Sequence, residues 1–133
     1  MGEAYANAIS ILVVEDDPMV ATYILDVLEE LGFVVVGLAS SGSEALTLVG
    51  QTHPSLALMD VRLAGPMDGA EVAQVFRSQY RVPVIFVSGF SDAVTIERAK
   101  ATQPLDLLVK TFRPSQVFNA IETAGVYSIE LNP

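Results

Sequence analysis

Five side chains able to take part in phosphate or metal chemistry each lie at or just after the end of an apolar segment: Glu15, Asp16, Asp60, Ser88 and Lys110. Clustered carboxylates raise one another's pKa unless a cation neutralises them. Mg²⁺ suits this task, because it takes one or two carboxylates, several waters and a phosphate oxygen. Asp60 is then left as a nucleophile that can carry a phosphoryl group. Lys110 would supply positive charge and Ser88 a hydroxyl donor to that group.

The apolar segments alternate with segments of helical spacing. They are short and rich in β-branched residues, and they span residues 9–14, 33–38, 56–59, 84–87 and 105–109. Nearly continuous apolar runs are typical of strands covered on both faces. The alternation predicts an α/β fold of three layers with a parallel five-stranded sheet. With the flavodoxin-like strand order 2-1-3-4-5, the five side chains converge at the carboxyl edge of the sheet.

Three pairs of residues mark helix starts: Asp17 with Pro18, Ser41 with Glu44, and Asp68 with Glu71. The first pair predicts an N-cap before a proline at the first helical position, and the other two predict capping boxes. Asp17 is therefore interpreted as a helix cap rather than a metal ligand. Gly32 is expected in the left-handed conformation that often ends a helix.

Length and composition restrict the classes of function. The 133 residues suit one domain, and we expect it at 9–124, between an extension at 1–8 and a tail at 125–133. The absence of cysteine excludes disulfides and thiolate metal sites. A net charge of −9 argues against direct nucleic-acid binding. No apolar run approaches the ~20 residues of a membrane span, and no signal-peptide pattern is visible, so we expect a cytoplasmic protein without membrane contact.

Five motifs occur in order along the chain: ILVVEDDP, LALMDVRL, PMDG, PVIFVSG and LLVK. Together they resemble the receiver domain of two-component response regulators. The resemblance covers nearly the whole chain. It implies a switch rather than an enzyme, because such a domain catalyses only its own phosphorylation and dephosphorylation. The switch is expected to be of the stand-alone type, and a phosphorelay intermediate or a receiver cut out of a longer chain stay open.

The resemblance also implies a role for each acidic residue. Asp60 would accept a phosphoryl group from a phosphohistidine on a sensor histidine kinase or a histidine phosphotransfer protein. Asp16 would bind Mg²⁺ directly and Glu15 through water. Asp60 and the backbone carbonyl of Arg62 would complete the metal site.

Four residues would bind the phosphoryl group or respond to it: Arg62, Ser88, Gly89 and Lys110. Ser88 would turn toward the group and Gly89 would leave room for it. Lys110 would pair with its oxygens. Output would pass to a downstream protein target. The resemblance places the output and homodimer surface on the fourth helix, fifth strand and fifth helix.

The sequence departs from the family pattern in three places. Leu107 occupies the position of the switch aromatic, so its coupling to Ser88 is expected to differ. Thr111 replaces a proline that follows a cis bond. A cis non-proline bond costs about 3 kcal/mol, so we predict a trans Lys110–Thr111 bond. The segment 63–66 is one residue longer than usual.

Two other functions remain open at this point. A receiver-like adaptor that works without phosphorylation would be compatible with Leu107 and Thr111. An enzyme on the same architecture, such as a flavodoxin or an aspartate-nucleophile phosphatase, is disfavoured. The acidic loop after the first strand has no glycine-rich phosphate cradle, and no second acid follows Asp60 to act as a general acid.

Overall fold

The protein was analysed as a computed structural model, which describes residues 9–89, 93–110 and 112–123. One parallel sheet of five strands has the order β2-β1-β3-β4-β5, which confirms the flavodoxin-like prediction. The strands are β1 (Ser10–Val14), β2 (Val34–Ala39), β3 (Leu56–Asp60), β4 (Val84–Ser88) and β5 (Asp106–Val109). Their ends differ from the predicted ones by at most one residue. The extension, the tail and the Lys110–Thr111 bond lie outside the described residues.

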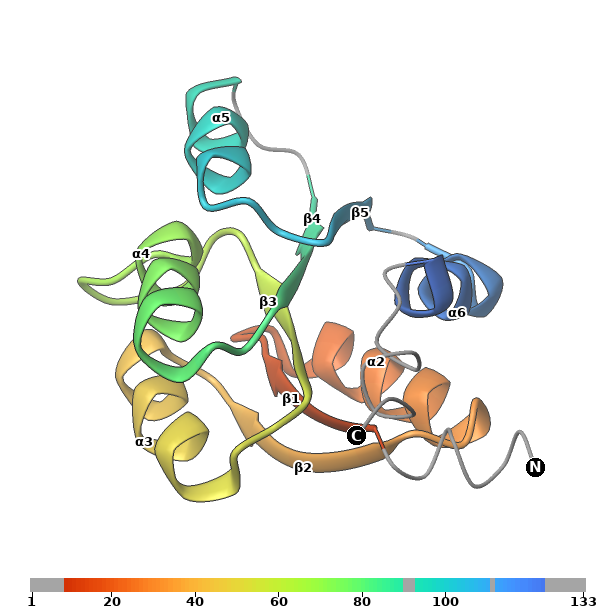
Figure 1. Cartoon of the computed structure of the whole chain (residues 1–133). Helices are drawn as coiled ribbons and strands as arrows, with labels where there is room; N and C mark the ends of the chain where they lie inside the picture. Colours follow the sequence, from red (N-terminus) through yellow and green to blue (C-terminus); the bar gives the residue numbers. More distant parts are fainter. Residues whose placement is uncertain (1–8, 90–92, 111, 124–133) are drawn as a thin grey trace.

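Helices cover both faces of the sheet (Figure 1). They are α2 (Pro18–Glu30), α3 (Gly42–Thr52), α4 (Gly69–Val75) with a π-helical continuation η1 (Phe76–Tyr80), α5 (Ala93–Ala101) and α6 (Pro114–Thr123). Helices α2 and α6 lie on one face, and α3, α4 and α5 lie on the other. No helix within the described ranges is long and apolar enough to cross a membrane.

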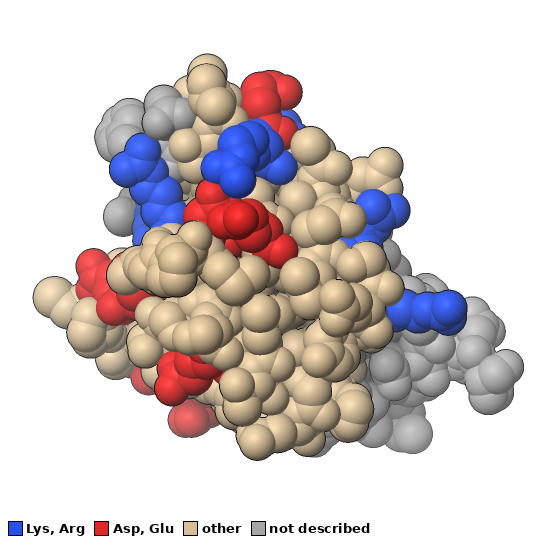
Figure 2. Space-filling view, turned by 90° about the vertical axis from the view of Figure 1, so that its left-hand side faces the viewer, with Lys and Arg blue, Asp and Glu red and all other residues tan. Residues whose placement is uncertain are grey.

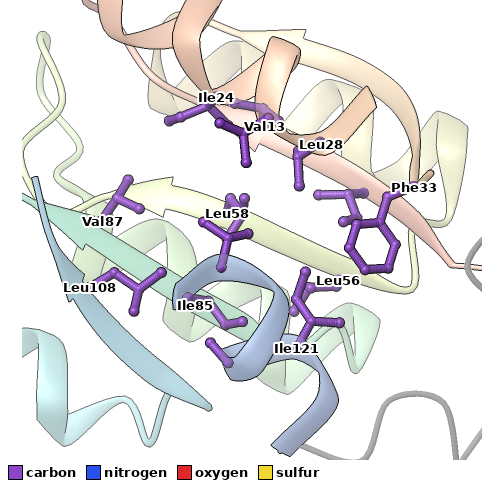
Figure 3. Packing of buried hydrophobic residues seen from close by; sticks show 14 of the residues in the cluster. Val13, Ile24, Leu28, Phe33, Leu56, Leu58, Ile85, Val87, Leu108 and Ile121 are labelled. Atoms are coloured by element: carbon purple, nitrogen blue, oxygen red, sulfur yellow. The ribbon is translucent and has the colours of Figure 1, made fainter. Parts of the chain in front are cut away.

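Two apolar cores hold the layers together, one on each face of the sheet. Figure 3 shows the core under α2 and α6, where Ile24 and Leu28 of α2 and Ile121 of α6 meet Leu58 and Ile85 of the central strands. The opposite core packs α3, α4 and α5 against the other face of the same strands. Because alternate residues of β1, β3 and β4 face opposite cores, these strands are apolar except at an end, where Ser10, Asp60 and Ser88 lie.

The two edge strands depart from the expectation of cover on both faces. Val34 and Leu38 of β2 are each 41% exposed, and Val109 of β5 is 63% exposed. The sequence could not distinguish them from central strands, since an apolar run looks the same in either position.

Helix starts follow the predicted caps with one exception. Asp17 accepts hydrogen bonds from the backbone of α2, and Asp68 forms a complete capping box with Glu71. Ser41 accepts from the Glu44 backbone N–H, but the Glu44 carboxylate accepts from Ser40 instead of returning to Ser41. The capping-box prediction at Ser41 was therefore half wrong, because the Glu44 carboxylate accepts hydrogen bonds from the backbone N–H and the hydroxyl of Ser40.

Candidate functional site

The site lies at the carboxyl edge of the sheet, where the central strands end. Asp60 and Ser88 are the last residues of β3 and β4, and Glu15 and Lys110 directly follow β1 and β5. The parallel register therefore brings these side chains to one edge. The second strand contributes only a backbone contact, since the Ala39 carbonyl accepts a hydrogen bond from the Glu15 N–H at 2.9 Å.

Three carboxylates gather at this edge. Each of Glu15, Asp16 and Asp60 offers an oxygen, and these oxygens lie within 4.8 Å of one another. Glu15 and Asp60 are buried, whereas Asp16 is exposed. The Asp17 N–H donates to Glu15 Oε2 at 3.1 Å and fixes the orientation of that carboxylate. One exposed and two buried acids form an acidic pocket with an opening to solvent.

Lys110 provides the positive charge of the pocket. Its Nζ lies 3.1 Å from Glu15 Oε1 and 3.1 Å from Asp60 Oδ2. Burial alone lowers the pKa of the lysine, but the charge of Asp60 and the bonds to both acids outweigh burial and hold the pKa above its usual 10.5. The Lys110 N–H also donates to the Ser88 carbonyl at 2.6 Å, which connects the lysine to the end of β4.

The surroundings of Glu15 disfavour the ionised form of its carboxylate. Burial, followed by the neighbouring Asp60 carboxylate, raises the pKa of Glu15 to about 7 against the opposing effects of the Asp17 N–H and Lys110. Its Oε1 accepts no hydrogen bond of ordinary geometry from any described residue. An additional cation would stabilise the ionised form of a buried carboxylate whose pKa is raised in this way.

The donor set fits a magnesium ion. When ionised, the three carboxylates carry three negative charges against the single positive charge of Lys110. Hard oxygen donors, one of them exposed, match the preference of Mg²⁺ for a few carboxylates together with water. Glu15, Asp16 and Asp60 are the residues that would hold the ion.

The backbone after Asp60 is tightly constrained. The Arg62 N–H donates to Asp60 Oδ1 at 3.1 Å, while the Arg62 residue as a whole is exposed. Gly69, at the start of α4, donates its N–H to the Val61 carbonyl at 3.0 Å. A Cβ on Gly69 would collide with the backbone carbonyl of Asp60. Sequence reasoning missed this role of Gly69, although its place directly after the Asp68 cap was a signal.

Ser88 and Gly89 lie beside the lysine. Ser88 is buried, and its Oγ donates to the Gly89 carbonyl at 3.0 Å. A Cβ on Gly89 would be 3.8 Å from Lys110 Cδ, an ordinary contact. The packing seen here therefore does not require a glycine at position 89, and its role in leaving space for a phosphoryl group stays a prediction.

Leu107 lies farther from the pocket, on β5. It is partly buried and packs against the core under α3, α4 and α5. It pairs with Phe86 of β4, two residues before Ser88. An apolar side chain at this position is held by the core and has no polar atom to exchange with the pocket.

Charge on the molecular surface bears on possible partners. Figure 2 shows the side that α3 and α4 cover, where Lys and Arg form separate small groups among uncharged and acidic residues. A nucleic-acid interface relies on a continuous basic patch. The face in this view has none, in agreement with the net charge of −9.

Comparisons with known proteins agree with this geometry. The family model described as "Response regulator receiver domain" matches residues 11–122. PdtaR, a transcriptional regulatory protein of Mycobacterium tuberculosis, is 32% identical over 86% of this chain and 55% of its own length. MtrA, a DNA-binding response regulator of Mycolicibacterium smegmatis, is 36% identical over 80% of this chain and 46% of its own length. The chain thus spans about half the length of these relatives.

Solved structures show the same architecture. The signal receiver domain of a modulated diguanylate cyclase from Desulfovibrio desulfuricans G20 superposes with a TM-score of 0.86. It is 31% identical, and the match covers 93% of this chain and 98% of that one.

Proposed function

Because the chain belongs to the response regulator receiver family, we propose that it is a phosphoacceptor switch in which Asp60 receives the phosphoryl group. One observation carries this proposal. The Asp60 carboxylate is buried at the end of β3, with Lys110 Nζ at 3.1 Å and two further acids within 4.8 Å. A nucleophilic carboxylate, a cationic partner and a set of metal ligands thus occupy one pocket.

Phosphoryl transfer can be derived from these groups. An oxygen of Asp60 attacks the phosphorus of a phosphohistidine, the P–N bond breaks, and the imidazole nitrogen leaves with the electron pair. Bound Mg²⁺, held by Glu15, Asp16 and Asp60, would neutralise charge on the transferred group. Lys110 would leave Asp60 Oδ2 and pair with a phosphoryl oxygen. Attack of water on phosphorus later restores the carboxylate and releases phosphate, so the protein acts only on itself.

A change of shape would start at Ser88. The Ser88 Oγ would exchange its bond to the Gly89 carbonyl for one to a phosphoryl oxygen. Because the Lys110 N–H is bonded to the Ser88 carbonyl, movement of the serine would displace the start of the segment after β5. Leu107 would follow through packing alone, since it has no hydroxyl or ring edge to exchange hydrogen bonds.

Partners follow from the same proposal. A sensor histidine kinase or histidine phosphotransfer protein would donate the phosphoryl group in the cytoplasm, and a downstream protein would read the result. The face of α5, β5 and α6 is a suitable output or homodimer surface. Val94 and Val109 on it are 69% and 63% exposed, and Ala99 is the single buried residue within the described length of α5. An ion pair of 2.6 Å between Arg98 and Asp68 also joins α5 to the start of α4.

The test is incubation with acetyl phosphate and Mg²⁺, followed by separation on a phosphate-affinity gel. Wild-type protein is expected to shift, and the shift should disappear with EDTA. Asp60→Asn is the matched control, since it keeps the shape of the side chain. A shift of equal size in Asp60→Asn would refute the proposal.

A phosphorylation-independent adaptor is the second candidate. It is favoured by one observation, that Lys110 Nζ already has carboxylate partners in Glu15 and Asp60 without a phosphoryl group. NMR spectra with Mg²⁺ and beryllofluoride, a mimic of the phosphoryl group, distinguish the two. Unchanged spectra would favour the adaptor.

A further inference from the structure

Two hydrogen bonds hold the backbone at and just after Lys110, and the second of them lies outside the pocket. In the first, the Lys110 N–H donates to the Ser88 carbonyl at 2.6 Å. In the second, the segment after Lys110 reaches Phe112, whose carbonyl accepts a hydrogen bond from the Tyr23 hydroxyl at 2.7 Å. The two residues are 89 positions apart in sequence, so this bond joins α2 to the segment between β5 and α6.

The contact between Tyr23 and Phe112 extends beyond one hydrogen bond. The two rings are tilted at 51° with their centroids 5.7 Å apart. Phe112 is buried in the core under α2 and α6, whereas Tyr23 is 42% exposed. Tyr23 also lines an apolar groove of about 350 Å³ whose walls include Lys110 itself, together with Met19 and Phe112. The phenol thus lies between the helix and the lysine's own segment.

Helix α2 is also the element that orients the head of the lysine. The Asp17 N–H at its start fixes Glu15, and Glu15 Oε1 contacts Lys110 Nζ at 3.1 Å. Tyr23 lies farther along the same helix. The N-cap of α2 thus contacts Glu15, the partner of the ammonium group, and Tyr23 within α2 contacts the segment that follows Lys110.

We propose that Tyr23 is a positioning residue that holds Lys110 in place for the phosphoryl group through the Phe112 carbonyl. This rests on the proposed function, because Lys110 is the group that would meet the phosphoryl oxygens. Tyr23 itself touches neither the metal ligands nor the reacting carboxylate in any contact of the described structure.

The experiment compares wild-type protein with Tyr23→Phe and Tyr80→Phe. Both variants remove one phenol hydroxyl. Tyr80 ends η1, and its hydroxyl has no hydrogen bond to any described residue, so it is the matched control. In metal-free protein, hydrogen exchange of the Lys110 amide is expected to be about five-fold faster in Tyr23→Phe, as loss of one hydrogen bond implies. Exchange at Leu58, in the centre of the sheet, should not change.

Ligand binding gives the second measurement. Beryllofluoride affinity should fall about five-fold in Tyr23→Phe, while Mg²⁺ affinity, which depends on the three acids, stays within the wild-type range. Tyr80→Phe should match wild type in both.

Three results would overturn the proposal that Tyr23 positions Lys110. The first is that Tyr23→Phe behaves as Tyr80→Phe in every measurement, and the second is that Tyr23→Phe accelerates exchange at Leu58 as much as at Lys110. The third is that Tyr23→Phe loses Mg²⁺ affinity and beryllofluoride affinity to the same extent. Failure of wild-type protein to bind beryllofluoride would refute the proposed function instead. The amide measurement would still decide whether Tyr23 holds Lys110.

Discussion

The pKa of Glu15 makes the stability of the metal-free protein depend on pH. The folded state raises this pKa from 4.5 to about 7, chiefly through burial. Between these values the folded state binds more protons than the unfolded state, so stability falls as pH rises. A shift of this size corresponds to about 3 kcal/mol of unfolding free energy, lost by a pH slightly above 7. Lys110 contributes no slope here, because its raised pKa keeps it charged throughout.

Replacing Glu15 with Gln should remove this dependence. Glutamine resembles the protonated acid and its carbonyl can still accept from the Asp17 N–H. Urea unfolding in EDTA at pH 5 and pH 8 is the assay, with Glu30→Gln at an exposed position as the control. At pH 8 we expect Glu15→Gln to be more stable than wild type by up to about 3 kcal/mol, with part of the gain offset by the lost contact to Lys110. At pH 5 the two should be similar.

Two results would refute this reasoning. If Glu15→Gln were the less stable protein at pH 8 without metal, the pair with Lys110 would outweigh the cost of burial. If wild type and Glu15→Gln showed the same slope between pH 5 and pH 8, another group would be responsible. Saturating Mg²⁺ should flatten the wild-type slope, because the ion favours the ionised carboxylate.

Other substitutions test the packing and the charges of the site. Gly69→Ala should lower the free energy of unfolding in urea by about 2 kcal/mol, because its Cβ meets the Asp60 carbonyl. Gly89→Ala, whose Cβ makes only an ordinary contact with Lys110, should lower it much less. Equal losses of stability in the two variants would contradict the packing argument. Lys110→Ala should slow phosphorylation by acetyl phosphate at least ten-fold by removing a charged partner of the phosphoryl oxygens, and a rate near wild type would show that the lysine is dispensable. Asp17→Ala should lower stability by about 1 kcal/mol through loss of the α2 cap; a loss of Mg²⁺ binding with stability unchanged would make it a ligand instead.

The fold followed from local patterns to a large extent. Five apolar runs and the strand order were predicted correctly, because each central strand is covered on both faces and its end carries a polar residue. The exposure of β2 and β5 was not predicted, since edge position depends on the whole sheet. The half-formed box at Ser41 depended on which backbone N–H the Glu44 carboxylate meets, and residue types do not specify that.

The site was predictable as a set of residues but not as a set of contacts. Spacing brought Glu15, Asp16, Asp60 and Lys110 to one edge, and the structure places them together. That Lys110 contacts Glu15 as well as Asp60 depends on how far the side chain extends across the sheet. The bond from Tyr23 to Phe112 joins residues with no local relationship. Their proposed roles in phosphorylation remain predictions.

The most direct test identifies the phosphorylated residue itself. Protein treated with acetyl phosphate and Mg²⁺ is reduced with borohydride, which converts an aspartyl phosphate to homoserine, and the peptides are sequenced by mass spectrometry. Homoserine is expected at position 60, and not at Asp16 or Asp17. Homoserine at another position, or none after treatment of folded protein, would contradict this expectation.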